Sequence, residues 1–140
     1  MRWVGSIILS LLLFYAIPSV GQSQNDVGYK IVSIYFRGGS YFVDDAQKER
    51  VREFLSKEIL SNYEIHIHSH TDNVGGVEFN EWLSKMRSEA TYFFLITDGI
   101  PERQVFIKDH GLFNPDFDNQ TNDGRARNRR VDVVLWPLPM

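Results

Sequence analysis

The stretch EIHIHSHTDNVGG, residues 64–76, combines the pattern of a strand with that of a turn. Isoleucine and histidine alternate along it, and side chains alternate between the two faces of a strand. The isoleucines therefore belong to one face, and the other carries the histidines His66, His68 and His70. The glycines after Asp72 are typical of a turn. The stretch predicts a strand, residues 63–71, that ends by presenting an aspartate beside a glycine turn.

Three more segments have the β-branched and aromatic composition of strands. They are residues 29–36, 104–111 and 128–136. In the last of them, Val131, Val133 and Leu135 share one face. A polar loop, residues 112–126, is expected before this final strand.

Two helices are predicted between the strands. The first is capped by Asp44 or Asp45, and its apolar stripe comprises Val51, Phe54, Leu55 and Ile59. The second runs from Glu78 to Asp98, and one broad apolar arc contains Phe79, Leu83, Met86, Ala90, Phe93, Phe94 and Thr97. Gly99 is expected to cap this helix, and Pro101 prevents its continuation.

The resulting order of strand, helix, strand, helix, strand, loop and strand predicts an α/β (α+β) fold. It would be a two-layer sandwich, with both helices on one face of a small mixed sheet. The opposite sheet face is expected to contact solvent. A chain of 140 residues is long enough for one such domain and too short for two.

The first residues have the layout of a secretory signal peptide. One basic residue precedes an apolar run, residues 4–16, and small residues follow, so cleavage is expected after Gly21. A membrane anchor would need roughly 20 apolar residues, more than this run supplies. The expected division is a signal peptide at 1–21, a flexible leader at 22–28, one domain at 29–136 and a tail at 137–140.

Composition narrows the classes of function. The chain has a formal net charge of −3, which disfavours nonspecific binding to nucleic acid or to anionic membranes. The basic run at residues 125–130 has no interleaved aromatic platform, so no nucleic-acid partner is expected. Without cysteine there is no disulfide and no lipid-attachment cysteine, and the exported protein is expected to be soluble. The sequence contains no catalytic constellation, so neither an enzyme nor a cofactor is expected.

One charge lies close to the apolar arc of the second helix. At about 100° per residue, Arg87 falls about 40° from Leu83, and Asn80 lies on the same side. A guanidinium at the edge of a buried face needs a partner, and Asp72 can face back toward it. Two interpretations stay open. The pair can be a structural ion pair, or it can flank a cleft and hold the ammonium and the carboxylate of a zwitterion.

These residues resemble the motifs of the OmpA-like peptidoglycan-binding domain. The first motif comprises His70-Thr71-Asp72, the turn NVGG, Asn80, Leu83-Ser84 and Arg87. The second comprises Asn119, Thr121, Gly124-Arg125 and Asn128-Arg129-Arg130-Val131. Both have the family's spacing, and the likeness covers about residues 31–135. Ser69 departs from the family's usual glycine.

The resemblance implies noncovalent binding of peptidoglycan through the diaminopimelate of its stem peptide, in the periplasm and peripheral to the outer membrane. The implied ligand contacts are Asp72 and Arg87, with Arg130 beside the same cleft and Thr71 and Asn80 as supporting contacts. Outer-membrane or other envelope proteins and a second copy of the chain are further candidate partners. Such a homodimer would raise avidity on the polymer.

The three histidines permit a second hypothesis. His66, His68 and His70 could hold a metal, which would make the domain a periplasmic metal-binding or protein-interaction module. However, residues two apart on a strand lie about 7 Å apart along it. The favoured interpretation is that His66 and His68 are polar residues on a solvated face, and that His70 orients the turn presenting Asp72. No metal is therefore expected.

Overall fold

A computed structural model describes residues 28–139, so the predicted signal peptide and nearly all of the predicted leader lie outside the described residues. Its strands are β1 (Lys30–Tyr35), β2 (Tyr63–His70), β3 (Val105–Gly111) and β4 (Arg130–Pro137). Its helices are α1 (Asp45–Ser56), α2 (Val77–Thr97) and α3 (Asn122–Asn128), with short 3-10 turns at Leu60–Asn62 and Glu102–Gln104.

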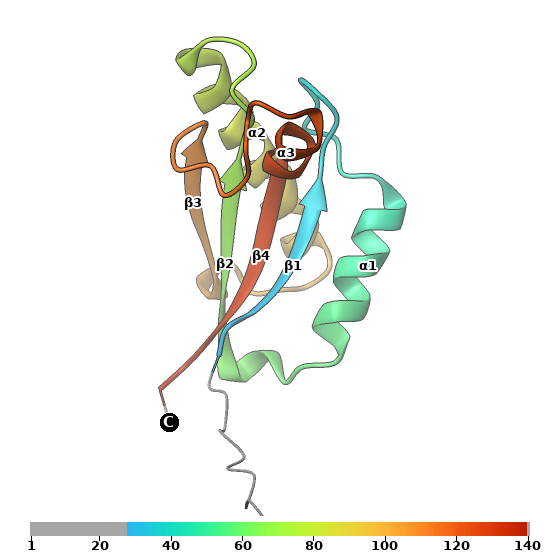
Figure 1. The fold of residues 1–140 in the computed structure, drawn as a ribbon. Helices are drawn as coiled ribbons and strands as arrows, with labels where there is room; N and C mark the ends of the chain where they lie inside the picture. The colour runs from blue at the N-terminus through green and yellow to red at the C-terminus, as the bar shows by residue number, and fades with distance from the viewer. Residues whose placement is uncertain (1–27, 140) are drawn as a thin grey trace, which may run out of the picture.

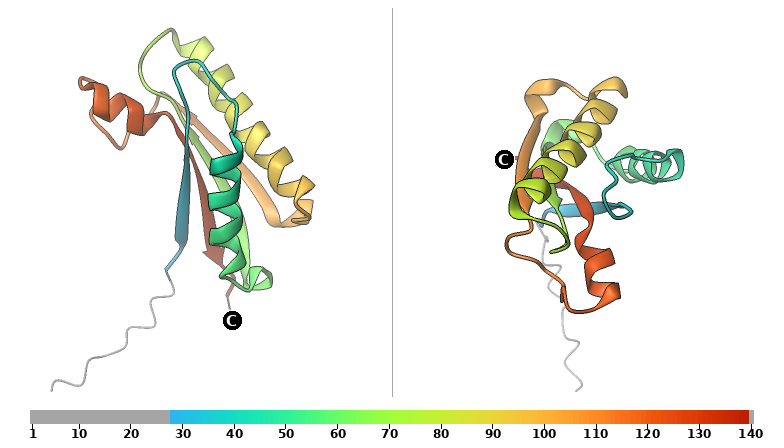
Figure 2. Two further views of the ribbon diagram at one scale, coloured as in Figure 1. Left: turned by 90° about the vertical axis from the view of Figure 1, so that its right-hand side faces the viewer. Right: turned by 90° about the horizontal axis from the view of Figure 1, so that it is seen from above.

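The four strands form one mixed sheet in the order β1-β4-β2-β3. Strand β4 pairs antiparallel with both β1 and β2, and β2 pairs parallel with the edge strand β3. Helices α1 and α2 cover one face of this sheet (Figures 1 and 2). The predicted α/β fold with a small mixed sheet is confirmed.

The core lies between the sheet and these two helices. On β2, Ile65 and Ile67 are fully buried, as their alternation with histidine predicted. The predicted inward face of β4 is confirmed in the same way by Val131, Val133 and Leu135. Burial of these side chains supplies the main driving force for the fold, at roughly 1.5–3 kcal/mol for each large aliphatic residue.

The ends of the two long helices follow from local chemistry. Asp44 caps α1, because its side chain accepts a hydrogen bond of 2.9 Å from the backbone N–H of Gln47. Gly99 follows α2 with φ of 92°, as expected of a glycine that ends a helix. The predicted stripe of α1 was wrong at Ile59, because the helix ends at Ser56 and Ile59 is 70% exposed.

The buried face of α2 is rotated from the predicted one. Phe79 and Phe93 were expected to face the core, but they are 46% and 65% exposed. The buried residues are Asn80, Leu83, Ser84, Arg87, Ser88, Thr91, Phe94 and Leu95. Small polar side chains on this face let the helix lie close to β2, where Ser69 and Ser84 exchange hydrogen bonds with each other's backbone carbonyls. Arg87 is therefore near the middle of the buried face.

The outer sheet face is less open than predicted. Helix α3 lies within and just after the segment expected to be a loop, and Figure 2 shows it on the side of the sheet away from α1 and α2. Phe117, from the loop before it, packs against the guanidinium of Arg130 at 5.2 Å. Arg130 and Asp132 are consequently buried on a face that was expected to be solvated.

Candidate functional site

The β2–α2 turn presents Asp72 in a fixed conformation. One carboxylate oxygen of Asp72 accepts a hydrogen bond of 3.1 Å from the backbone N–H of Val74. The Asn80 side-chain amide donates to the carbonyls of Val74 and Gly76, at 3.0 and 3.1 Å, and so fastens the turn to the helix. Gly75 has φ of 91°, which favours glycine. These contacts hold the turn against the start of α2.

A pocket of about 230 Å³ opens beside this turn. Its lining residues are Gly38, Gly39, Asp72, Val74, Phe79, Asn80, Leu83 and Arg129. They come from the β1–α1 loop, the β2–α2 turn, the start of α2 and the residue after α3, segments that meet at the upper end of the sheet in Figure 1. This pocket unites two of the predicted site residues, Asp72 and Asn80.

Arg129, and not Arg87, is the ion-pair partner of Asp72. Its guanidinium donates to the Asp72 carboxylate at 2.9 Å and to the Phe36 carbonyl at 3.2 Å. The Asp72 side chain is 9% exposed and the Arg129 side chain is 22% exposed. The pair therefore forms part of the pocket wall, with the guanidinium on the more open side.

Arg87 is fully buried and is held by backbone oxygens. It donates to the carbonyls of Ser40, His70 and Arg37, at 2.8, 3.2 and 3.2 Å. Among residues 28–139, no carboxylate makes an ion pair with it, so the structural pair considered between Asp72 and Arg87 is not formed. Burial lowers the pKa of Arg87 to about 10, while the negative charge of Asp72 acts to raise it. Arg87 thus ties the β1–α1 loop to the end of β2 beneath the pocket.

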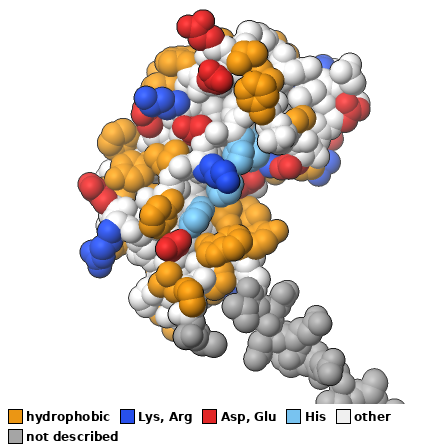
Figure 3. Space-filling view, turned by 90° about the vertical axis from the view of Figure 1, so that its left-hand side faces the viewer, with side chains coloured by type: hydrophobic (Ala, Val, Ile, Leu, Met, Phe, Trp, Pro, Cys, Tyr) orange, Lys and Arg blue, Asp and Glu red, His pale blue; other side chains and the backbone are white. Residues whose placement is uncertain are grey.

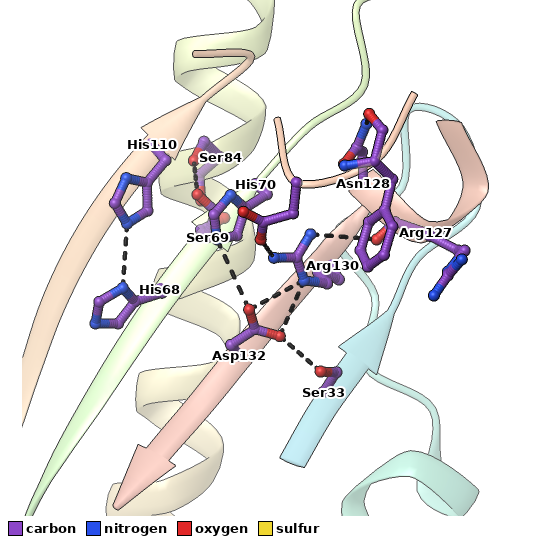
Figure 4. Close-up of polar contacts among 12 residues, drawn as sticks. Ser33, His68, Ser69, His70, Ser84, His110, Arg127, Asn128, Arg130 and Asp132 are labelled. Carbon is purple, nitrogen blue, oxygen red and sulfur yellow. Dashed lines mark hydrogen bonds and ion pairs between the residues drawn. The ribbon is translucent and has the colours of Figure 1, made fainter. Parts of the chain in front are cut away.

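Arg130 points away from this pocket. It donates to both carboxylate oxygens of Asp132, at 3.1 and 3.0 Å, and also contacts Asp116 (Figure 4). Ser33 donates to the same Asp132 carboxylate at 2.6 Å. The arginine of this motif that lies beside the pocket is therefore Arg129. Strand alternation could have found it, because Arg129 shares its parity with the inward Val131.

Residues of the second sequence motif position Arg129. Thr121 caps α3 by accepting a hydrogen bond from the Gly124 N–H, and the Asn128 amide donates to the carbonyl of Phe117. A Cβ atom at Gly124 would lie 1.9 Å from the Asp118 carbonyl oxygen, so only glycine fits there. These contacts fix the short helix whose end delivers Arg129 to the pocket.

Two predicted supporting residues have unusual environments. The Thr71 hydroxyl and the Asn80 amide oxygen are buried and have no hydrogen-bond partner among the described residues. The ring of His70 stacks on His110 at 4.7 Å, and its Nε2 lies 3.7 Å from Asp132. Burial, and then the charge of Arg130, lower the pKa of His70 to about 4, so the ring is neutral at pH 7. Its backbone carbonyl, rather than its ring, contacts the Arg87 that braces the turn.

One cluster has the side chains of a metal site. His70, Asp116 and Asp132 each place a potential ligand atom within 4.8 Å of the others. The Arg130 guanidinium already contacts both carboxylates. It supplies the positive charge that a metal would bring, so these residues are better explained as an arginine-centred structural network.

Comparison with known proteins identifies the family to which the chain belongs. The model of the OmpA family matches residues 35–129, so the chain belongs to the OmpA family. It is 35% identical over 74 residues to the probable lipoprotein YiaD of Escherichia coli, covering 53% of this chain and 34% of that protein. It is also 35% identical over 69 residues to the peptidoglycan-binding protein ArfA of Mycobacterium tuberculosis, covering 49% of this chain and 21% of that protein.

A solved structure shares the fold at higher coverage. The peptidoglycan-associated lipoprotein of Burkholderia pseudomallei superposes with a TM-score of 0.64 at 29% identity, covering 74% of this chain and 88% of that one. The chain spans about a third or less of the length of the two curated relatives above. Within residues 28–139, none of the helices has both the length and the apolar character that crossing a membrane requires.

Proposed function

We propose that the chain binds peptidoglycan noncovalently in the bacterial envelope, through the pocket between the β2–α2 turn and Arg129. Family membership supports this function, as do the names of two relatives, a peptidoglycan-binding protein and a peptidoglycan-associated lipoprotein. The observation that carries the proposal is the Asp72–Arg129 ion pair in the pocket wall. The domain would act as a binding module and not as an enzyme.

The proposed ligand group is the free amine and carboxylate of diaminopimelate. Its ammonium would replace the guanidinium on Asp72, and Arg129 would turn to the carboxylate. One ion pair would thus be exchanged for two, with carboxylate geometry matched to the guanidinium fork. The unpaired amide oxygen of Asn80 in the same wall can accept an N–H of the ligand.

Arg87 has a supporting role in this proposal. It is fully buried and its guanidinium donates hydrogen bonds to backbone carbonyls, so it holds the loops that form the pocket. Its charge also contributes a positive potential beneath the site for the ligand carboxylate. Thr71 supports the turn through its N–H, which donates to Gly111 at 2.8 Å. Arg130 is not part of the proposed site, because it lies on the outer face.

Sedimentation with isolated sacculi tests the proposal. Asp72→Asn keeps an oxygen for the Val74 contact but removes the charge, and charge-assisted hydrogen bonds contribute roughly 1.5–3 kcal/mol each. We therefore expect binding to weaken by about 10- to 100-fold, with circular dichroism unchanged. Free diaminopimelate should compete with sacculi for the wild-type protein.

The matched control is Asp116→Asn, which removes a carboxylate from an arginine pair outside the pocket. It should pellet as the wild type does. If the wild type stays in the supernatant, peptidoglycan binding is wrong. If Asp72→Asn and Asp116→Asn lose binding equally, the proposed pocket is wrong.

A further inference from the structure

On the outer face of the sheet, the ring nitrogens of two histidines lie within hydrogen-bond distance of each other. The Nδ1 of His68, on β2, lies 3.1 Å from the Nε2 of His110, on β3 (Figure 4). His68 is paired in register with Lys108, while His70 is paired with Gly111, so His110 is the extra residue of a bulge in β3. A bulge re-aims side chains, and here it turns His110 toward His68.

The separation of the two nitrogens suits metal ligands. Zinc–nitrogen bonds of 2.0–2.1 Å place two ligands of a tetrahedral ion about 3.3 Å apart. The observed 3.1 Å differs from that distance by only a few tenths of an ångström. In the hydrogen bond, the N–H of one ring points at the nitrogen lone pair of the other. Metal binding therefore requires the donor ring to carry its proton on its other nitrogen, and both rings to turn by roughly 35° so that their lone pairs meet at one tetrahedral ion. Histidine rings permit it because their χ2 preference is broad.

We propose that His68 and His110 bind one divalent late transition-metal ion, of the Zn²⁺ or Cu²⁺ class, with solvent completing its coordination. Imidazole is a preferred ligand of these ions. Desolvation by burial lowers the pKa of both rings, which leaves them neutral at pH 7. This site is separate from the pocket of Asp72 and does not depend on the proposed peptidoglycan binding.

Neighbouring groups limit the site to these two side chains. The Nε2 of His66 is engaged by the Glu64 carboxylate at 2.9 Å, and the ring centres of His66 and His68 are 6.2 Å apart. His70 stacks parallel to His110, at 9°, so the two rings do not converge on one point. Figure 3 shows that histidine side chains reach the molecular surface on this face, where solvent can supply the remaining ligands.

Lys108 opposes the proposed ion. It is paired in register with His68, and its positive charge is one of the causes that lower the pKa of both histidines. A metal cation at the same place would be repelled in the same way. Lys108→Gln should therefore bind Zn²⁺ more tightly than the wild type does, which an incidental histidine contact would not explain.

The test is isothermal titration of the untagged protein with ZnCl₂ in chelator-treated buffer. We expect one saturable equivalent of Zn²⁺ for the wild type. His68→Gln and His110→Gln should each weaken binding by roughly tenfold or more. His66→Gln is the matched control, a histidine on the same strand face outside the pair, and it should leave the affinity unchanged.

Two other readouts keep the test independent of folding defects. The circular dichroism spectrum and the urea unfolding midpoint of each variant should match those of the wild type, which shows that the domain is folded. The imidazole nitrogen resonances of His68 and His110 should both move when Zn²⁺ is added, while those of His66 stay in place. Absence of a saturable Zn²⁺ equivalent in the wild type overturns the proposal. So does a loss of affinity in His66→Gln equal to that in His68→Gln.

Discussion

Arg129 and Arg130 are adjacent in the chain and pair with aspartates on opposite sides of the sheet. Arg129 contacts the single carboxylate of Asp72 and is 22% exposed at the pocket wall. Arg130 lies between Asp132 and Asp116, and its side chain is 6% exposed. Under the proposed function, the inner arginine would exchange its partner for a ligand, whereas the outer one is enclosed by its partners. The same ion-pair chemistry would then serve recognition on one side and structure on the other.

A third arginine extends this comparison. Arg87 is buried more deeply than Arg129 or Arg130, and it is hydrogen-bonded to carbonyls instead of carboxylates. A buried cation held by several hydrogen bonds stabilises its surroundings mainly because removing it leaves those partners unsatisfied. We therefore expect replacement of Arg87 to lower the free energy of unfolding more than replacement of Arg130 does. Binding, in contrast, is expected to depend most on Arg129.

The largest effect on stability is expected for Arg87→Met. The carbonyl of the buried His70 would be left unsatisfied, at about 1–3 kcal/mol, and the carbonyls of Arg37 and Ser40 would also lose their donor. We expect the free energy of unfolding to fall by about 3–5 kcal/mol, measured by urea denaturation. Lys85→Met, on the exposed face of the same helix, should change it by less than about 0.5 kcal/mol. Equal unfolding midpoints for the two variants would contradict the bracing role.

Arg130→Gln should be the next most destabilising change. Asp132 would keep only the hydrogen bond from Ser33 and would remain a buried carboxylate without its cation. A loss of about 2–3 kcal/mol is expected by chemical denaturation. Binding to sacculi at a temperature where the variant is folded should match the wild type. Impaired binding in a fully folded Arg130→Gln would show that the outer face takes part in recognition.

A smaller effect on stability is expected for Gly124→Ala. The added methyl group would meet the Asp118 carbonyl, so the start of α3 must shift, at a cost of about 1–3 kcal/mol. Because α3 delivers Arg129 to the pocket, this variant should also bind sacculi more weakly. Asn122→Ala, at the first position of the same helix, is the control. Unaltered binding in a destabilised Gly124→Ala would separate α3 from the site.

The sheet and two long helices could be predicted from the sequence, because local patterns encode them. The alternation of isoleucine with histidine on β2 placed both faces correctly, and Asp44 and Gly99 marked helix ends by their own chemistry. Helix α3 could not be predicted in this way. Its seven residues contain a glycine and no apolar stripe, and the helix depends on contacts of Thr121 and Asn128 with the preceding loop.

The position of Arg87 differed from the prediction because of tertiary packing. Hydrophobicity alone centred α2 on its aromatic residues, but close packing against Ser69 selected the small side chains and turned Arg87 inward. Likewise, the contact of His68 with His110 arises from the parallel pairing of β2 and β3 and from a bulge. Such contacts depend on tertiary geometry and leave no periodic signal in the sequence.

Comparison of the two neighbouring arginines tests most directly whether the inner pocket binds the ligand. Arg129→Gln and Arg130→Gln would be titrated with a soluble muropeptide containing diaminopimelate, and affinity would be measured by nuclear magnetic resonance. We predict that Arg129→Gln weakens binding by about tenfold or more, since it loses a charge-assisted contact, and that Arg130→Gln retains wild-type affinity. Wild-type affinity in Arg129→Gln, with loss in Arg130→Gln, would contradict the assignment of recognition to the inner pocket.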